Sequence, residues 1–352
     1  MLSSLWHRNS AFRIFSFSGF ITAAVLVAVF ILAGPAAFLI AVALIIIEVT
    51  FSFDNAVINA RVLRELSPFW QKIFLTVGIA IAVFGMRIIF PIAIVAITTT
   101  LNWREVLNLS LNDPNKYAIA LKEAEPAIAA FGSAFLLMLV LHFFTSREKK
   151  VHWFKLLEKG LIAIPGKWSY AAMVAFIVVV VAAMPSNQHP EQTLKAGFAG
   201  IVIYAVIHWL STHFMPRLHH RRIARTGVAG FVGFLYLEIL DASFSLDSVI
   251  GAFALTNKVL LIAAGLGVGA IWVRSMTVYI TRRETLNVYR YLEHGAHYAV
   301  GILALSLLIS LFLDIPEVVT GIFGVSVIVL AVLESRKANK EKVSELAEEV
   351  QL

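Results

Sequence analysis

The sequence predicts an all-α fold, a polytopic transmembrane helix bundle of about ten helices. Its composition is the first observation: 59% of the 352 residues are apolar and only 14% are charged. With a mean hydropathy of +0.84, this balance is far from that of a soluble globular protein. The second observation is that apolar runs long enough to cross about 30 Å of hydrocarbon recur along the whole chain. The third is that the density of basic residues alternates from one connecting segment to the next.

The predicted helices follow one another through short connections. They span residues 14–34, 36–60, 70–98, 126–145, 168–184, 196–214, 228–255, 258–280, 296–313 and 317–334. We divide the chain into an N-terminal tail with the first helix (1–35), a three-helix unit (36–146), a basic loop with two helices (147–227), a second three-helix unit (228–313), and a last helix with a charged tail (314–352).

The basic residues predict how the chain is oriented. Of the 29 Lys and Arg residues, 22 lie in segments on the side of the N-terminus and five on the opposite side. Because Lys and Arg accumulate in cytoplasmic loops, both termini are expected in the cytoplasm. Basic loops beside anionic lipid also account for the net charge of +7, so no nucleic-acid partner is expected. We interpret 215–225 and 147–160 as such loops, and the second as an amphipathic helix at the membrane interface.

A ten-residue phrase occurs twice inside apolar runs, as "EVTFSFDNAV" at 48–57 and "DASFSLDSVI" at 241–250. Each copy places two carboxylates six residues apart. The two remaining basic residues, Arg87 and Arg274, lie in the helix after each copy, nine residues after a glycine. The corresponding helices (2–4 and 7–9) are five crossings apart, and an odd separation inverts one unit relative to the other. Inverted repeats are typical of secondary transporters, whose substrate site lies near the midplane where the repeats meet.

The intramembrane charges predict a cation. An ionised Asp near the bilayer centre costs roughly 2.5–3.5 kcal/mol on insertion scales, and the two arginines account for only two of five acids. Either some carboxyls are protonated or a cation resides there, and we expect one cation held by four carboxylates. Asp54 and Asp247 form the first pair, and Glu48 and Asp241 the second. The residues expected to support these ligands or balance their charge are Thr50, Ser52, Arg87, Glu238, Ser243, Ser245 and Arg274.

The ligand types favour a hard divalent ion. The chain has no cysteine, and we find no histidine deep in a predicted helix. Carboxylates, amides and hydroxyls suit Mg²⁺, Mn²⁺ or Ca²⁺, whereas Zn²⁺ and copper favour thiolate and imidazole. The sequence chemistry leaves these three ions open, and we expect the ion to be cargo, with no prosthetic group.

Four features of the sequence resemble the TerC family of the LysE superfamily. They are an acid followed by "SFDN" and repeated as "SLDS", an arginine in the next helix, "EHGAHY" at 293–298 and "AFGSAFLLMLVLHFF" at 130–144. The resemblance covers roughly residues 36–334 and is greatest to a branch labelled as a domain of unknown function. It implies an exporter in the bacterial inner membrane, with Mn²⁺ as the substrate and older links to tellurite resistance. The metal site that it implies consists of Glu48, Asp54, Asn55, Asp241, Asp247 and Ser248. The second copy departs from the first where Ser248 replaces Asn55.

Acids and histidines also mark the two mouths of the bundle. Glu293, His294 and His297 lie at the expected cytoplasmic mouth, but they lack the H-E-x-x-H spacing of a metalloenzyme, so no enzymatic activity is expected. On the opposite side, Glu123 and Glu125 precede Pro126, which is expected to start a helix that the two acids favour.

Two other functions stay open at this point. One is export of a different cationic solute, such as a basic amino acid. The other is a non-transporting accessory role in metal or tellurite resistance. The sequence does not indicate an oligomeric state.

Overall fold

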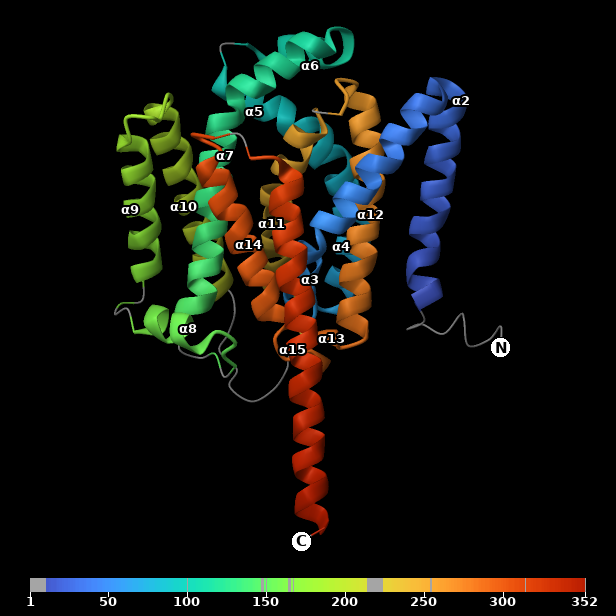
Figure 1. Cartoon of the computed structure of the whole chain (residues 1–352). Helices are drawn as coiled ribbons and strands as arrows, with labels where there is room; N and C mark the ends of the chain where they lie inside the picture. The colour runs from blue at the N-terminus through green and yellow to red at the C-terminus, as the bar shows by residue number, and fades with distance from the viewer. Residues whose placement is uncertain are drawn as a thin grey trace.

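The computed structural model describes residues 11–99, 101–146, 149, 151–163, 166, 168–213, 224–253, 255–313 and 315–351, without the side chains of 246, 247, 317 and 342–351. This part of the chain is an upright bundle of α-helices without β-strands (Figure 1). Eight helices are long and apolar enough to cross a membrane. Counting the two arms of the first helix separately and adding one shorter apolar helix, 169–183, gives ten candidate crossings. The predicted all-α membrane bundle is therefore confirmed.

The first two predicted helices form one element with a sharp bend. Helix α2 (Ala11–Phe51) kinks at Gly34, whose φ of 82° and ψ of 179° are not helical, and Pro35 follows directly. Glycine adopts a positive φ at no steric cost, and proline lacks the N–H that would continue the helix. The two arms therefore run in opposite directions (Figure 1). The second arm packs along α12 (Val259–Arg282).

The predicted helix 36–60 is broken at the first copy of the repeated phrase. Helix α2 ends at Phe51, and α3 (Phe53–Leu63) begins after Ser52, whose φ of −97° and ψ of 18° interrupt the helix. The second copy lies within a continuous helix, α11 (Gly227–Ala252). Nearly identical phrases thus have different backbones.

The predicted helix 70–98 contains a wider turn that the sequence did not predict. It consists of α4 (Pro68–Ala80), a π-helical segment η1 (Ile81–Ile89) and α5 (Phe90–Thr98). Pro91 lies just after η1 and removes one backbone donor from the helix. The π-helical segment, which carries Arg87, directs this side chain into the bundle, where it is 3% exposed.

The predicted start of a helix at Pro126 is wrong. Helix α7 (Pro114–Thr145) already begins at Pro114, because the Asp113 side chain accepts a hydrogen bond from the Lys116 backbone N–H and proline suits the first helical position. Pro126 lies inside this helix, so Glu123 and Glu125 are not in its first turn. The expected role of these two acids at a helix N-terminus is therefore also wrong.

The remaining elements complete the bundle and its two ends. They are α6 (Trp103–Asn112), α8 (Lys155–Ile162), α9 (Ser169–Ala183), α10 (Pro190–His213), α13 (Thr285–Val288), α14 (Leu292–Ile309) and α15 (Glu317–Gln351). The last of these continues well past the predicted end at residue 334. Helix α7 lies largely within the protein, whereas α2 and α15 expose most of their apolar surface, as expected for helices in contact with lipid.

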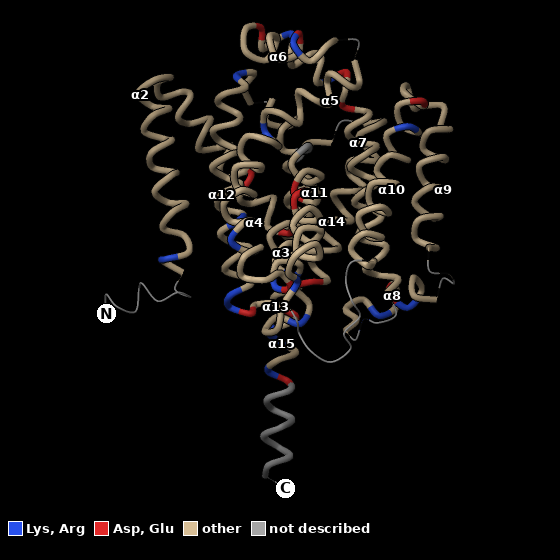
Figure 2. Tube along the Cα trace, turned by 180° about the vertical axis from the view of Figure 1, so that it is seen from behind, with Lys and Arg blue, Asp and Glu red and all other residues tan. Residues whose placement is uncertain are grey.

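The charged residues of the described chain are unevenly distributed between the two ends of the bundle. Basic residues gather at the end where α8 and α13 lie, and acidic and basic residues are mixed around α6 at the opposite end (Figure 2). The start of α2 and the C-terminal part of α15 both lie at the basic end (Figure 1). At this end Arg225 forms an ion pair with Glu65, and a single parallel bridge joins Arg225 to Leu66.

The expected topology can be tested with single cysteines, because the chain has none of its own. Asn108 in α6 and Lys340 in α15 are both exposed. Helix α6 and the C-terminal part of α15 lie at opposite ends of the bundle. We expect Asn108→Cys to react with a membrane-impermeant maleimide from outside the cell, and Lys340→Cys only after the cells are opened. Labelling of both variants from the same side would contradict this topology.

Candidate functional site

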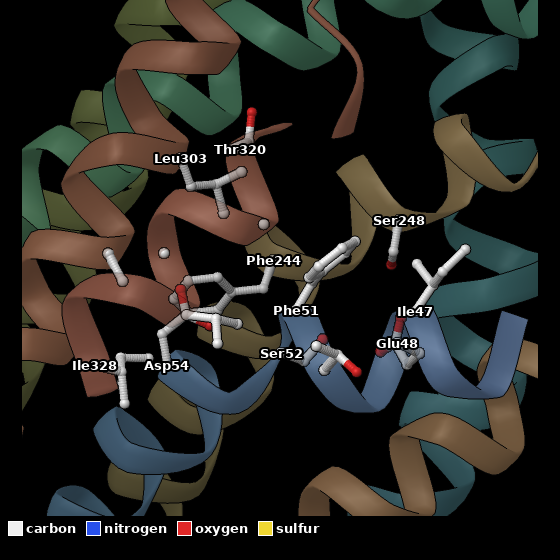
Figure 3. A pocket seen from close by; sticks show the side chains of 15 residues that line it. Ile47, Glu48, Phe51, Ser52, Asp54, Phe244, Ser248, Leu303, Thr320 and Ile328 are labelled. Atoms are coloured by element: carbon white, nitrogen blue, oxygen red, sulfur yellow. The ribbon is translucent and has the colours of Figure 1, made fainter. Parts of the chain in front are cut away.

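A small cavity with one polar wall lies at the break between α2 and α3. The cavity has a volume of about 50 Å³, which is room for a few water-sized groups. Its polar wall is formed by Glu48, Thr50, Ser52, Asp54, Ser248 and Thr320. Its apolar wall includes Phe51, Phe244, Leu303 and Ile328 (Figure 3). The cavity thus lies between the phrase-bearing helices and the α14–α15 pair.

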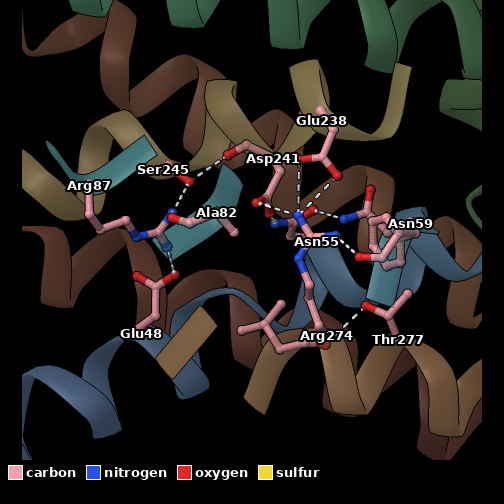
Figure 4. Close-up of polar contacts among 12 residues, drawn as sticks. Glu48, Asn55, Asn59, Ala82, Arg87, Glu238, Asp241, Ser245, Arg274 and Thr277 are labelled. Carbon is pink, nitrogen blue, oxygen red and sulfur yellow. Dashed lines mark hydrogen bonds and ion pairs between the residues drawn. The ribbon is translucent and has the colours of Figure 1, made fainter. Parts of the chain in front are cut away.

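The two carboxylate oxygens of Glu48 have different surroundings. One carboxylate oxygen, Oε1, accepts a hydrogen bond from Nη2 of Arg87, whose Nη1 donates to Ser245 Oγ at 2.5 Å (Figure 4). The other oxygen, Oε2, is buried and has no hydrogen-bond partner among the described residues. Gly269 of α12 makes room for this side chain, because an added Cβ would lie 2.5 Å from Glu48 Cβ. Glu48 therefore has one oxygen on the arginine and one buried without a partner among the described residues.

Arg274 organises a second cluster around two acids. Its Nη2 lies 3.2 Å from both carboxylate oxygens of Glu238 and 3.3 Å from Asp241 Oδ2 (Figure 4). Its Nη1 donates to the Phe74 carbonyl at 3.2 Å, and the guanidinium lies 4.0 Å from the centre of the Phe74 ring. Gly78 makes this approach possible, because a Cβ there would lie 2.5 Å from Glu238 Oε1.

The same cluster binds the amide side chains of α3. Asn55 Nδ2 donates to Asp241 Oδ1 at 2.9 Å, and Asn59 Nδ2 donates to Asn55 Oδ1 at 2.7 Å. Asn55 and Asp241 are therefore engaged in the arginine cluster and do not line the cavity.

The structure divides the six predicted metal ligands into two groups. Glu48, Asp54 and Ser248 line the cavity, whereas Asn55 and Asp241 belong to the Arg274 cluster. The side chain of Asp247 lies outside the described residues. Among the side chains that are described, no three from His, Asp and Glu come together in a way that could hold a metal ion.

Most of the residues expected to support the ligands also fall into two groups, those that line the cavity and those that bind an arginine. Thr50 and Ser52 line the cavity directly, and Ser245 and Glu238 bind Arg87 and Arg274. Ser243 Oγ donates to the carbonyl of Ile239, one helical turn earlier. As the sequence predicts, both intramembrane arginines contact carboxylates and are buried, so neither faces lipid.

The residues of the expected cytoplasmic mouth make contacts away from the cavity. Glu293 forms an ion pair with Arg61. His294 Nε2 lies 2.9 Å from the Val151 carbonyl, and His297 Nδ1 lies 2.8 Å from the carbonyl of Glu293. The His297 ring also stacks on Phe143 with 3.7 Å between ring centres.

Sequence reasoning missed the contribution of α15. Thr320, Gly321 and Gly324 line the cavity, and the Phe51 ring packs so closely on Gly321 that a Cβ there would lie 2.2 Å from it. No charge or repeat in the sequence marks these positions. Phe51 and Phe244 could have been found, because they occupy equivalent places in the two copies of the phrase.

A second hollow has a different character. It measures about 530 Å³ and lies between α5, α7 and α10, with mostly apolar walls. Its few polar residues, among them Gln192 and Lys195, include no acid that could replace the water shell of a cation. The small cavity is therefore the better candidate site for an ion.

The Glu48–Arg87 pair should stabilise the fold. Replacing Arg87 with Leu leaves a buried carboxylate without its cation, a change that typically costs about 3–5 kcal/mol. We expect the Arg87→Leu variant, purified in detergent, to unfold at a clearly lower temperature than wild type. The Arg87→Leu, Glu48→Leu double variant should recover part of the loss, because neither charge is then left unpaired. Equal loss in the single and double variants would contradict the pairing.

Gly78 should be required by the Arg274 cluster. In Gly78→Ala the new Cβ would lie 2.5 Å from Glu238 Oε1 and 2.7 Å from Arg274 Nη1, and such overpacking typically costs about 1–3 kcal/mol. Gly301→Ala in α14 is the matched control, because its nearest neighbour, a Val140 methyl group, would lie at an ordinary 3.5 Å. Thermal unfolding should show a loss for the first variant and none for the second.

Comparison with known proteins gives one match. A family model described as a protein of unknown function, DUF475, matches residues 53–342, which extend from the start of α3 into α15. No curated protein and no solved structure matches the chain. The matched region holds Asp54, the whole second copy of the phrase and both intramembrane arginines. On this match, the chain belongs to the DUF475 family.

Proposed function

We propose that this protein is a membrane transporter that exports a hard divalent cation, with Mn²⁺ as its substrate. Its membrane would be the bacterial inner membrane, with both termini in the cytoplasm. The observation that carries the proposal is the cavity at the helix break, where the carboxylate residues Asp54 and Glu48 and four hydroxyl residues line one wall inside a membrane-spanning bundle. The identity of the ion and the direction of transport rest on the resemblance to the TerC family.

The charges around the cavity favour a divalent ion. Glu48 is balanced by Arg87, whereas Asp54 has no ion pair among the described residues and is 6% exposed. Asp54 lies in the first turn of α3, where the helix dipole partly offsets its negative charge. An uncompensated carboxylate in a membrane interior is costly, and a bound cation removes that cost. With Asp247 as the second ligand, the charge of a divalent ion would balance both aspartates.

The pairing of the two arginines supports the proposed inverted repeat. Glu48 and Asp241 occupy the same position in the two copies of the phrase, and each binds the arginine of the helix that follows its own copy. Such a repeat would bring Asp54 and Asp247 face to face near the midplane. In this arrangement the arginines hold the first acid of each copy, so that the second acids can bind the cargo.

The cavity wall offers ligands suited to a metal ion. Its volume of about 50 Å³ is room for a cation with a few waters. Oxygen donors at all the polar positions of the cavity wall suit Mn²⁺, Mg²⁺ and Ca²⁺ alike. Competition among these three ions for the purified protein would establish its selectivity.

Asp54 and Asp247 provide the test. Asp54→Asn and Asp247→Asn each remove one ligand charge with little change in volume, so both variants should fold as wild type does. We expect Mn²⁺ binding by the purified protein to weaken at least about tenfold, the lower range for altered metal sites. Neither variant should relieve manganese toxicity in a strain that depends on this protein for resistance.

The matched control is Asp113→Asn. Asp113 lies at the start of α7, outside the cavity, and its pKa is lowered by hydrogen bonds from Lys116. This variant should bind Mn²⁺ and protect cells as wild type does. Full protection by both Asp54→Asn and Asp247→Asn would overturn the proposed site.

A further inference from the structure

A fully buried carboxylate lies in the short helix at the basic end of the bundle. Helix α8 (Lys155–Ile162) is exposed over most of its length, yet the Glu158 side chain has no exposure at all. No residue of α8 lines the cavity described above. The position of Glu158 therefore needs a separate explanation.

Both oxygens of Glu158 are occupied. Lys149 Nζ lies 2.7 Å from Oε2, and the backbone N–H groups of Trp153 and Phe154 donate to Oε1 at 3.0 and 3.2 Å. His152 Nδ1 also lies 3.1 Å from Oε2. Burial opposes ionisation, but the hydrogen bonds, that from Lys149 first, outweigh it and hold the pKa of Glu158 below its usual range. Glu158 is therefore a fixed anion at neutral pH.

This anion also connects α8 to the helix beside the cavity. The hydroxyl group of Tyr298 donates to Glu158 Oε1 at 3.3 Å, and His294 Nε2 lies 3.7 Å from Oε2. Both residues are on α14, which continues into Ala299 and Leu303 in the cavity wall. Helix α14 therefore contacts both Glu158 of α8 and the cavity.

The exposed residues of the same segment are apolar and basic. Phe154, Leu156 and Leu157 are 48%, 93% and 58% exposed, and Lys155 and Lys159 lie exposed among them. Helix α8 lies across the basic end of the bundle, beside α7 and α9 at its rim (Figures 1 and 2). Apolar side chains flanked by lysines at the rim of a membrane bundle are typical of a helix that rests in the headgroup layer of anionic lipid.

We propose that α8 is a binding site for anionic phospholipid headgroups, and that Glu158 couples this site to the cavity by holding α14. Lys155 and Lys159 bind the headgroup, and Leu156 and Leu157 enter the acyl-chain boundary. With α8 held at the membrane surface, the hydrogen bond from Tyr298 and the contact of His294 with Glu158 keep α14 in place against the cavity. Loss of the lipid frees α8 and loosens α14.

The lipid site can be measured without any transport. The Gly160→Cys variant, at an exposed position of α8 with no neighbour within 4 Å, carries a bimane label in the full chain purified in detergent. Short-chain phosphatidylglycerol should change the fluorescence at lower concentration than short-chain phosphatidylcholine. Lys155→Gln and Lys159→Gln should each weaken the phosphatidylglycerol response by about fivefold, the effect of one surface lysine on anionic lipid.

Lys195→Gln is the control for that measurement, because this exposed lysine lies at the opposite end and pairs with Glu191. It should leave the response unchanged. Equal responses to the two lipids, or no effect of the α8 lysines, would overturn the lipid site.

A second reporter tests the coupling. The Leu303→Cys variant, in the cavity wall, is reconstituted in vesicles of phosphatidylcholine with or without phosphatidylglycerol and treated with a small thiol reagent. Phosphatidylglycerol should slow the reaction, and Glu158→Gln should abolish this difference while the lipid affinity of α8 is retained. Tyr298→Phe removes only the hydroxyl group that joins α14 to Glu158 and should have the same effect if Glu158→Gln fails to fold.

A lipid effect that persists in both variants would overturn the coupling. The coupling of the lipid site to the cavity rests on the proposed function of that cavity. Neither measurement depends on metal transport, however, so failure of the coupling and failure of Mn²⁺ export are separate results.

Discussion

The pairing of two buried arginines with carboxylates is the constraint on which the centre of this bundle depends. A guanidinium inside a membrane protein is tolerated only where it faces the bundle interior and finds partners. Arg87 joins the phrase-bearing helices α2 and α11 through Glu48 and Ser245. Arg274 joins α11 and α12 to α4, because it binds Glu238, Asp241 and the Phe74 carbonyl. Two glycines, Gly78 and Gly269, provide the space that these contacts need.

The helix break at Ser52 distinguishes the two halves of the bundle. The second copy of the phrase stays within α11, but in the first copy the chain leaves helical geometry directly after Phe51. The Phe51 ring lies against Gly321 of α15, and this close packing accompanies the break. The break separates Glu48, held by Arg87, from Asp54 in the first turn of the next helix. It therefore produces both the cavity and the acid in it that has no arginine among the described residues.

The local pattern of the sequence predicted the class of the fold and much of its polar centre. Apolar length identified the membrane-spanning helices, because a helix must satisfy its backbone groups within itself to cross hydrocarbon. The same reasoning predicted that Arg87 and Arg274 would contact carboxylates, since an unpaired guanidinium is costly there. It failed at Pro126, where Asp113 and Pro114 start the helix earlier. It also did not predict the π-helical turn that orients Arg87.

The grouping of the acids was decided by tertiary structure alone. Glu48, Asp54 and Asp241 belong to the two copies of the repeated phrase, so the sequence assigned them to one cation site, and the family resemblance added Asn55. In the fold, Asp241 binds Arg274 and Asn55 binds Asp241, whereas Glu48 and Asp54 line the cavity. Thr320 and Gly321 of α15 complete the wall of the cavity from the far end of the chain. A sequence determines which helices carry charge, but the partner of each charge depends on helix rotation and close packing between segments distant along the chain.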